Sequence, residues 1–220
     1  MADPDGRRLI RAHARSLPAP VAPSSEQVRH ALSAAMDWVG RAQDHSGDGG
    51  IGSLHLVHGW GPTYPETTGY LIPTLLAAGE GLHRPDLAGR AVRAADTLLA
   101  VQRPDGGWQG GRVGEHRPSV VFNTAQVIRG MLAAHAYTGA QRYLDAAVRA
   151  GAWIVSVQEA DGCWSRHNFM GAARVYDTYV DAPLLLLHRA TGEPGLKEAA
   201  VRNLAWVEGR QAANGWFTDA

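Results

Sequence analysis

The stretch Gln102-Arg103-Pro104-Asp105-Gly106-Gly107-Trp108 returns in variant form along the whole chain of 220 residues. Residues 158–164 (QEADGCW) are the clearest copy, residues 211–216 (QAANGW) are one residue shorter, and residues 43–51 (QDHSGDGGI) are looser. The four leading glutamines are 59, 56 and 53 residues apart. Self-similarity at such a spacing indicates an architecture built from repeated supersecondary units.

Each copy ends a segment with helical periodicity, in which apolar side chains recur every three or four positions. Four such segments are apolar on one side only, so we expect each to bury one face and to expose the other. Ser24 or Ser25 is the expected N-cap of the first segment. The four segments lie at about residues 25–43, 87–98, 144–154 and 196–207.

Three further segments are apolar nearly all round, which predicts burial on every side. They are residues 67–78, 123–136 and 178–190, and they alternate with the one-sided segments. No segment shows the strict alternation of a strand. The pattern predicts an all-α fold of αα-hairpin repeats, with four outer and three inner helices.

The connections between these segments differ in length. Links from an inner to an outer helix are short and contain Thr138-Gly139 or Thr191-Gly192, as expected for a helix that stops at a left-handed glycine. Links from an outer to an inner helix run about twenty residues, at 44–65, 105–121 and 161–176. Loops of that length are usually functional or disordered. All three should emerge at the same end of the helices, so we expect any site to lie there.

Composition excludes several classes of function. The 21 basic residues balance the 21 acidic ones, so no global field favours nucleic acid or an anionic membrane. Cys163 is the only cysteine, which excludes an internal disulfide framework and a multi-cysteine zinc site. Residues 1–24 end in a proline-spaced stretch and contain no signal-peptide core. We expect a flexible arm there, one domain at residues 25–220, a cytoplasmic location, no membrane span, and neither cofactor nor metal.

A glutamine followed by Asp-Gly-Gly-Trp at the end of an outer helix resembles the QW-type repeat of terpenoid cyclases. Similar turns occur across the α/α-toroid superfamily, including protein prenyltransferases. Residues 64–70 (YPETTGY) resemble a segment of bacterial toroid proteins associated with polysaccharide biosynthesis. The resemblance covers about residues 25–217 and implies a partial (α/α) toroid. A closed toroid has more hairpins than these, so the resemblance implies either that the chain is a fragment of a toroid or that a homodimer contact or a partner protein covers an open edge.

The motifs that carry chemistry in these families are absent. Neither the Asp-x-Asp-Asp of squalene-type cyclases nor the Asp-Asp-x-x-Asp of ionising terpene synthases occurs. The Asp-Cys-His zinc set of prenyltransferases has no counterpart, because Cys163 lies inside a repeat. The repeat itself favours a structural role, since a glutamine amide can bond open backbone groups at a neighbouring helix end and a tryptophan can cover the joint.

Aligning the starts of the three all-apolar segments places Glu66, Asn123 and Asp177 at equivalent positions. One interpretation is helix capping, which suits Asn123 and Asp177 best. The other is that the three side chains face one cavity. Asp181 follows Asp177 by one helical turn, so both carboxyls should share a face. A close pair of this kind can split its two pKa values and serve as acid and base.

The long loops add ionisable and aromatic residues. Histidines there suit proton transfer near neutral pH, and arginines suit anionic groups on a substrate. Each one alone is also compatible with a solvated surface position; their concentration in equivalent loops favours function. The candidate catalytic residues are Glu66, Asp177, Asp181, His58, His116 and His167, and the candidate substrate-binding residues are Trp60, Tyr64, Asn123, Arg112, Arg174 and Tyr176.

Three hypotheses of function follow. The first is an enzyme (a lyase, hydrolase or epimerase) that applies general acid–base chemistry to a polar, carbohydrate-like small molecule or glycan. The second is a terpenoid-cyclase-like enzyme for an apolar prenyl or polyene chain, in a deep cavity lined by Tyr70, Phe122 and Tyr179. The third is a non-catalytic binding or assembly module. A polar cavity wall favours the first, an aromatic tunnel favours the second, and a pocket without two carboxylates favours the third.

Overall fold

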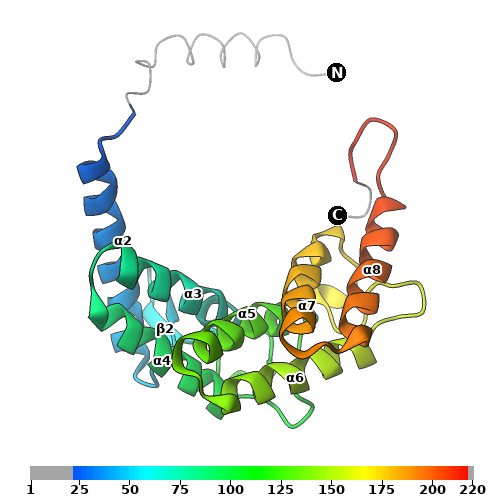
Figure 1. Ribbon diagram of the computed structural model, residues 1–220, viewed down its shortest axis with the longest axis horizontal. Coiled ribbons are helices and arrows are strands. Elements are labelled where there is room, and N and C mark those ends of the chain that lie inside the picture. The colour runs from blue at the N-terminus through cyan, green and yellow to red at the C-terminus, as the bar shows by residue number, and fades with distance from the viewer. Residues whose placement is uncertain (1–21, 218–220) are drawn as a thin grey trace. The chain divides into compact units, whose positions relative to one another are not determined.

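The structure, a computed structural model, describes residues 22–217 (Figure 1). Within that range the chain is mostly helical, as predicted, with one small two-stranded sheet. The helices are α2 (Ser25–Ser46), α3 (Pro65–Gly81), α4 (Pro85–Ala100), α5 (Val121–Thr138), α6 (Gln141–Ser156), α7 (Thr178–Thr191) and α8 (Pro194–Glu208). The strands are β1 (Gly52–His55) and β2 (Gly59–Thr63), and two short 3₁₀ turns, η1 (Phe169–Gly171) and η2 (Val175–Asp177), precede α7.

Contacts divide the chain into two units, residues 1–34 and residues 35–220, with the division inside α2. In the first unit the Ser24 amide donates to Gln27 Oε1 at 2.8 Å, and the Gln27 amide donates to Ser24 Oγ at 3.2 Å. This reciprocal capping box starts α2 at the predicted N-cap. Most of the arm expected at residues 1–24 lies outside the described residues.

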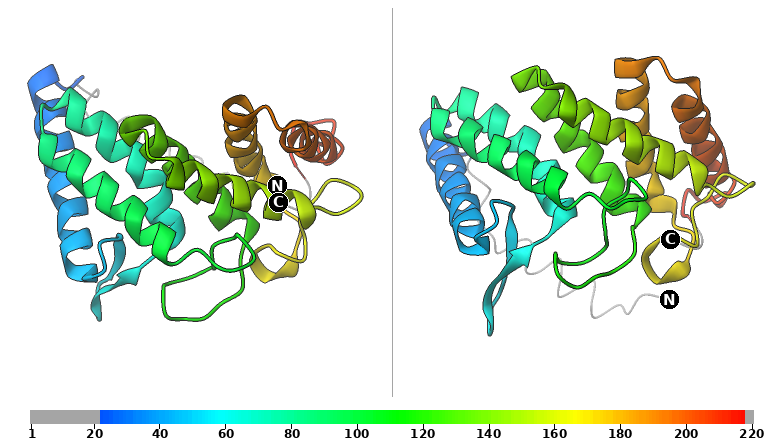
Figure 2. Two further views of the ribbon diagram at one scale, coloured as in Figure 1. Left: turned by 60° about the horizontal axis from the view of Figure 1, so that its bottom comes forward. Right: turned by 90° about the horizontal axis from the view of Figure 1, so that it is seen from below.

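The second unit is a series of αα-hairpins. Helices α3 and α4 pack together, as do α5 and α6, and α7 and α8, while α5 also lies between α3 and α7 (Figure 2). Helices α4 and α6 bury one face, whereas α5 buries side chains on most of its circumference. The prediction of burial on every side therefore holds for α5 but is wrong for α3 and α7, which expose Tyr70 and Leu186 on their other faces. None of the helices in residues 22–217 has the length and apolarity required to cross a membrane.

The first long loop departs from the helical expectation. Strands β1 and β2 pair antiparallel, with Leu54 opposite Trp60 and His55 opposite Gly59. The sequences GSLH and GWGPT show no period-two alternation, because glycine and proline interrupt it. Gly52 is required by close approach, since a Cβ there would lie 2.1 Å from Gly61 O. The sequence therefore conceals a hairpin that is held mainly by its backbone.

Helices α3 and α5 touch at a pair of glycines. A Cβ on Gly130 would lie 2.5 Å from Gly69 O, and a Cβ on Gly69 would lie 2.6 Å from Val127 Cα. Both distances are far inside van der Waals contact, so the two backbones meet directly. The fully buried side chain of Ile72, one turn after Gly69, lies beside this crossing, since its Cδ1 would be 2.9 Å from a Cβ on Gly130.

The glutamines of the repeat fasten each hairpin to the next. Gln102 Nε2 donates to Gly106 O in its own turn at 2.8 Å and to Ala146 O of α6 at 2.9 Å. Trp108 is fully buried, and its Nε1 donates to Leu98 O at 2.8 Å. The predicted structural role of the repeat is confirmed. The same pair of glutamine bonds is made by Gln43, to Gly49 and Arg90, and by Gln158, to Gly162 and Ala199.

Candidate functional site

The three long loops contact one another at one end of the helices. The Val113 amide donates to Thr63 O at 2.8 Å, which ties the second loop to β2. The Val121 amide, at the start of α5, donates to His167 O of the third loop at 2.9 Å. Figure 2 shows the hairpin and the two later loops along the same side of the helices. The expectation that these loops share one end is confirmed.

Two adjoining hollows open among these loops. The first, about 370 Å³, lies against Glu66 and Phe122, and the second, about 480 Å³, lies against Arg112 and Glu115. Because they share a wall of five residues, we treat them as one site, termed the loop cavity. The shared wall consists of Tyr64, Val120, Asn123, Asn168 and Phe169.

Glu66 brings a carboxyl to the loop cavity from the first turn of α3. Burial raises the pKa of this carboxyl above its ordinary value. A glutamic acid with a raised pKa is suited to donate a proton near neutral pH. Burial, and then the charges of Asp177 and Glu66, raise the pKa of Tyr176, which lines the same cavity.

Asp177 and Asp181 lie behind the cavity wall rather than in it. Asp177 is 0% exposed, and its Oδ2 accepts a 2.6 Å hydrogen bond from Asn168 Nδ2. Asp181 is 2% exposed, and within the described part of the chain neither of its carboxyl oxygens has a hydrogen-bond partner. Asn168 lines the cavity, so it connects the carboxyl pair to that space.

Burial sets the protonation of this pair. It raises the pKa of Asp177 to about 7, against the opposing effects of a backbone hydrogen bond, Asn168 and the Arg174 charge. Burial, and then the charge of Asp177, raise the pKa of Asp181 to about 8. The two groups titrate as a coupled pair, so at neutral pH the pair retains a proton. Within the described residues, the Nε of Arg174 is buried without a hydrogen-bond partner.

The last turns of α5 and α7 match residue for residue. In each, a left-handed glycine caps the helix, a threonine hydroxyl bonds back by one turn, and a histidine Nδ1 contacts the carbonyl of the next link. In this register Asp177 of α7 matches Thr124 of α5, and not Asn123. The matched residues are His135, Thr138 and Gly139 with His188, Thr191 and Gly192, which are 53 positions apart.

Thr124 in turn matches Thr68 of α3. Each hydroxyl accepts a backbone N–H at 2.9 Å just after a glycine turn, from Trp108 and from Ile51 respectively. The sequence alignment of Glu66, Asn123 and Asp177 is therefore replaced by one of Thr68, Thr124 and Asp177. The cause is the third loop: 19 positions separate Gln158 from Asp177, against 22 between Gln102 and Thr124, and η2 leads into α7.

This register gives Asp181 an unusual place. It matches Ile128 of α5 and Ile72 of α3, and both isoleucines are fully buried. A core position of the repeat thus carries an ionisable group in the last hairpin. A buried carboxyl without a hydrogen-bond partner destabilises the fold. Carboxyls perturbed in this way concentrate at functional sites.

Helix capping does not explain these polar side chains. The N-cap residues of α3, α5 and α7 are Tyr64, Val120 and Asp177, and none of them makes a side-chain capping bond. Asn123 lies inside α5, where its buried Nδ2 has no hydrogen-bond partner among the described residues. Asn123 instead lines both hollows of the loop cavity.

Several sequence-predicted site residues lie outside the loop cavity. His58 is exposed near the tip of the β-hairpin, and its ring stacks on His55 with centroids 4.6 Å apart. His116 is exposed in the second loop, at a φ of 51°. Trp60 packs against Trp38, with ring centroids 5.1 Å apart. The predicted constellation of acids with these two histidines is not assembled.

His167 also lies outside the loop cavity, and its ring packs against Trp153 of α6. Its ring meets the edge of Trp153 at a centroid distance of 5.6 Å, and it does not line either hollow. Arg112 does line the larger hollow, and Tyr64 and Tyr176 line the cavity as the sequence predicted. The structure thus brings together Tyr64, Glu66, Asn123, Tyr176 and Arg112, with Asp177 and Asp181 behind them.

Sequence reasoning missed Asn168 and Phe169, which lie in the shared wall. The clue to Asn168 is its burial, which no sequence pattern reveals. Part of the wall is aromatic: Phe122 meets Tyr176 edge-on at 5.4 Å and Tyr179 at 6.4 Å. Tyr70, expected in an aromatic tunnel, does not line either hollow.

Glu159, Asp161 and Cys163 form the one cluster of potential metal ligands found in residues 22–217, with ligand atoms within 4.8 Å of one another. Burial, reinforced by the two neighbouring carboxylates, raises the pKa of the Cys163 thiol to about 12. A thiol in that state is a poor ligand and nucleophile. Asp161 Oδ1 accepts from the Cys163 amide at 3.2 Å, so the cluster closes the glycine turn of the repeat.

No protein-family model matches this sequence, and no curated protein is significantly similar to it.

Proposed function

We propose that the hairpins form a partial (α/α) toroid and that the loop cavity is the active site of an acid–base enzyme. The observation that carries this proposal is the buried Asp177–Asp181 pair, connected to the cavity through Asn168. Two carboxyls one helical turn apart occupy positions that hold threonine and isoleucine in the other hairpins. A buried carboxyl pair of this kind does not stabilise the fold, so its presence supports a role in the site.

In this proposal Glu66 is the catalytic residue, because it is the acid that lines the smaller hollow. Its raised pKa suits a general acid that protonates a leaving oxygen or a general base after ionisation. Asp177 is a positioning residue: it accepts from Asn168 Nδ2 and so turns the Asn168 amide oxygen. That oxygen accepts from the Phe169 amide at 2.9 Å, which fixes the cavity wall.

The substrate class that fits best is a polar, carbohydrate-like molecule. Amide groups from Asn123 and Asn168 offer hydrogen bonds to hydroxyls, and rings of Tyr64 and Tyr176 offer flat apolar faces. Arg112 in the adjoining hollow suits a carboxylate or a sulfate on the substrate. The reaction would be a lyase, hydrolase or epimerase step.

The experiment that tests this proposal starts from binding. We would titrate the full chain with neutral oligosaccharides, with uronates and with prenyl diphosphates, and assay turnover of the class that binds. Glu66→Gln should lower turnover by about 10²–10⁴-fold with little effect on binding. The matched control is Glu80→Gln, an exposed acid near the other end of α3.

Asn168→Ala should move the pH dependence of turnover, because it separates Asp177 from the cavity. Unchanged turnover in both Glu66→Gln and Asn168→Ala would sink the assignment. Binding of prenyl diphosphates alone would instead favour the cyclase-like alternative. The specific observation behind that alternative is the aromatic edge of Phe122, Tyr176 and Tyr179.

A further inference from the structure

An ion pair between an aspartate and an arginine connects successive outer helices at the first two joints. Where α2 meets α4, Asp37 pairs with Arg84 at 2.6 Å. Where α4 meets α6, Asp96 accepts from Arg142 at 3.1 Å and from the Tyr143 hydroxyl at 2.7 Å. Asp37 and Asp96 are equivalent, since each lies six positions before the glutamine of its repeat.

The third joint, where α6 meets α8, lacks this aspartate–arginine interaction. The glutamine bonds set the register: Gln102 reaches Ala146 of α6 as Gln158 reaches Ala199 of α8. In this register Ala152 stands where α4 has Asp96. Gly195 and Leu196 stand where α6 has Arg142 and Tyr143. A carboxylate, a guanidinium and a phenol ring are thus all absent from equivalent places.

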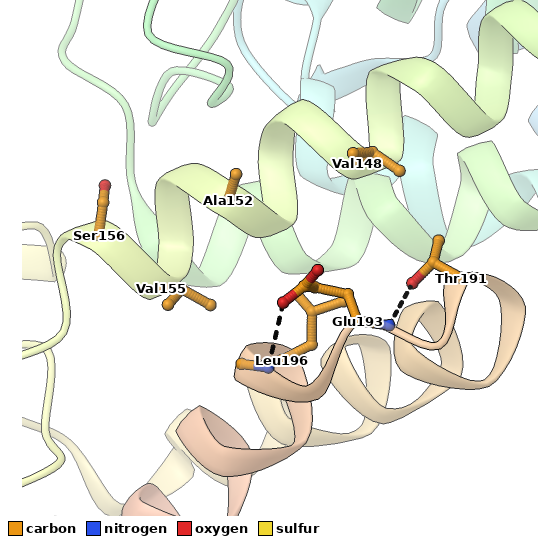
Figure 3. A pocket seen from close by; sticks show the side chains of 8 residues that line it. Val148, Ala152, Val155, Ser156, Thr191, Glu193 and Leu196 are labelled. Atoms are coloured by element: carbon orange, nitrogen blue, oxygen red, sulfur yellow. Dashed lines mark hydrogen bonds between the residues drawn. The ribbon is translucent and has the colours of Figure 1, made fainter.

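A hollow of about 450 Å³ occupies this joint, and we term it the α6–α8 pocket (Figure 3). Val148, Ala152 and Val155 of α6 form one wall, and Leu196 lies across from them. The size is within the usual range for a small-molecule site, and the body of the pocket is apolar. The pocket is separate from the loop cavity, and no residue lines both.

One charged group faces this pocket. Glu193, which stands where the second joint has Ala140, caps α8 by accepting from the Gly195 amide at 3.4 Å. Within residues 22–217, no lysine or arginine forms an ion pair with Glu193. Ser156 and Thr191 also line the pocket, and their hydroxyls donate to Trp153 O and to Leu187 O. The third joint therefore has an acid at a position that is alanine in the second, and it lacks the exposed Arg142 and the buried Tyr143 of the second.

We propose that the α6–α8 pocket binds a small molecule with a flat apolar body and a cationic group. The apolar body of the ligand lies against Val148, Val155 and Leu196, at the place equivalent to that of the Tyr143 ring in the second joint. The cation lies beside Glu193, at the place equivalent to that of the Arg142 guanidinium. Apolar burial supplies most of the affinity and the carboxylate selects the sign of charge. This inference is independent of the chemistry proposed for the loop cavity.

The probe for this proposal is tyramine, which carries a phenol ring and an ammonium group. Two-dimensional NMR of the full chain should show saturable shifts confined to residues of the α6–α8 pocket, with a Kd on the order of 1 mM or below. The matched anion, 3-(4-hydroxyphenyl)propionate, should bind several-fold more weakly. Glu193→Gln keeps the capping oxygen and should weaken tyramine binding about threefold.

A second variant restores the closed joint. The triple substitution Ala152→Asp, Gly195→Arg and Leu196→Tyr should abolish tyramine binding while leaving the chain folded, as judged by its helical circular dichroism. Asp96→Ala, in the second joint, should leave binding at the α6–α8 pocket unchanged. The proposal is overturned if tyramine shifts do not saturate, if the anion binds equally well, or if the folded triple variant still binds.

Discussion

At the scale of single residues, Asp181 is a position where this chain departs from its own repeat. The other hairpins hold Ile72 and Ile128 there, and both are fully buried. Asp181 keeps the burial but replaces a methyl surface with two oxygens that lack hydrogen-bond partners among the described residues. The folded state tolerates this because the group holds its proton.

Stability should therefore fall as pH rises. Burial raises the pKa of Asp177 to about 7 and of Asp181 to about 8, while the unfolded chain releases these protons near pH 4. Between those limits the folded state binds more protons than the unfolded state, so the free energy of unfolding decreases with pH. The slope for one such group approaches about 1.4 kcal/mol per pH unit. Urea unfolding measured from pH 5 to pH 8 checks this.

Variants of Asp181 separate its effect from that of other acids. Asp181→Ile restores the residue of the other hairpins and should raise stability at pH 8 while flattening the pH slope. Asp145→Asn, at an exposed position on α6, should leave the slope unchanged. A wild-type slope of zero or of opposite sign would show that Asp177 and Asp181 ionise in the folded state as freely as in the unfolded chain.

At the scale of elements, α3 and α5 can cross so closely because the residues at the crossing are glycines. Gly69 and Gly130 bring the two backbones into direct contact. Neither position can gain a methyl group without moving one helix away from the other. The pairing of these two hairpins therefore depends on glycine as much as on the apolar residues around it.

Gly130→Ala should destabilise the fold by about 1–3 kcal/mol, because its Cβ would lie 2.5 Å from Gly69 O. Gly89→Ala is the control, since a Cβ on that helical glycine would meet only Arg93 Nη1, at 4.0 Å, and alanine is the better helix former. The control should raise stability by about 0.5–1 kcal/mol. Thermal unfolding of the two variants checks both signs, and equal effects would refute a backbone contact.

Elements were more predictable from sequence than register was. The helices follow from apolar periodicity, and the glutamine turns follow from an obvious repeat. The place of Asp177 did not follow, because fewer residues separate Gln158 from Asp177 than Gln102 from Thr124, and a 3₁₀ turn leads into α7. The role of Asn168 was hidden for a related reason, since only tertiary burial distinguishes it from other loop residues.

At the scale of the whole molecule, the hairpins from α3 onward are joined in series. Each glutamine bonds its own turn and one carbonyl of the next outer helix. Gln211 repeats the first bond only, to Gly215 O at 3.1 Å, and Trp216 beside it is 75% exposed. Within residues 22–217, the last copy of the repeat thus bonds to no further helix.

The glutamines of the repeat should differ in how much they stabilise the fold. Gln102→Ala removes hydrogen bonds from Gly106 O and Ala146 O in a partly buried joint, so it should cost about 1–3 kcal/mol. Gln211→Ala removes one exposed bond and should change stability by less than about 0.5 kcal/mol. Chemical denaturation measures both. If the two variants lost similar amounts of stability, the bond from Gln102 to the following hairpin would not be what stabilises the fold.

The missing closure between α6 and α8 has a consequence for communication within the chain. The α7–α8 hairpin is held without the aspartate–arginine pair of the earlier joints, so its opening should require the least free energy. That same segment carries Asp177, which accepts a hydrogen bond from Asn168 of the loop cavity, and Glu193, which lines the α6–α8 pocket. A ligand that binds only the closed hairpin at one place stabilises the closed form at the other. The two sites are then thermodynamically linked although they share no residue.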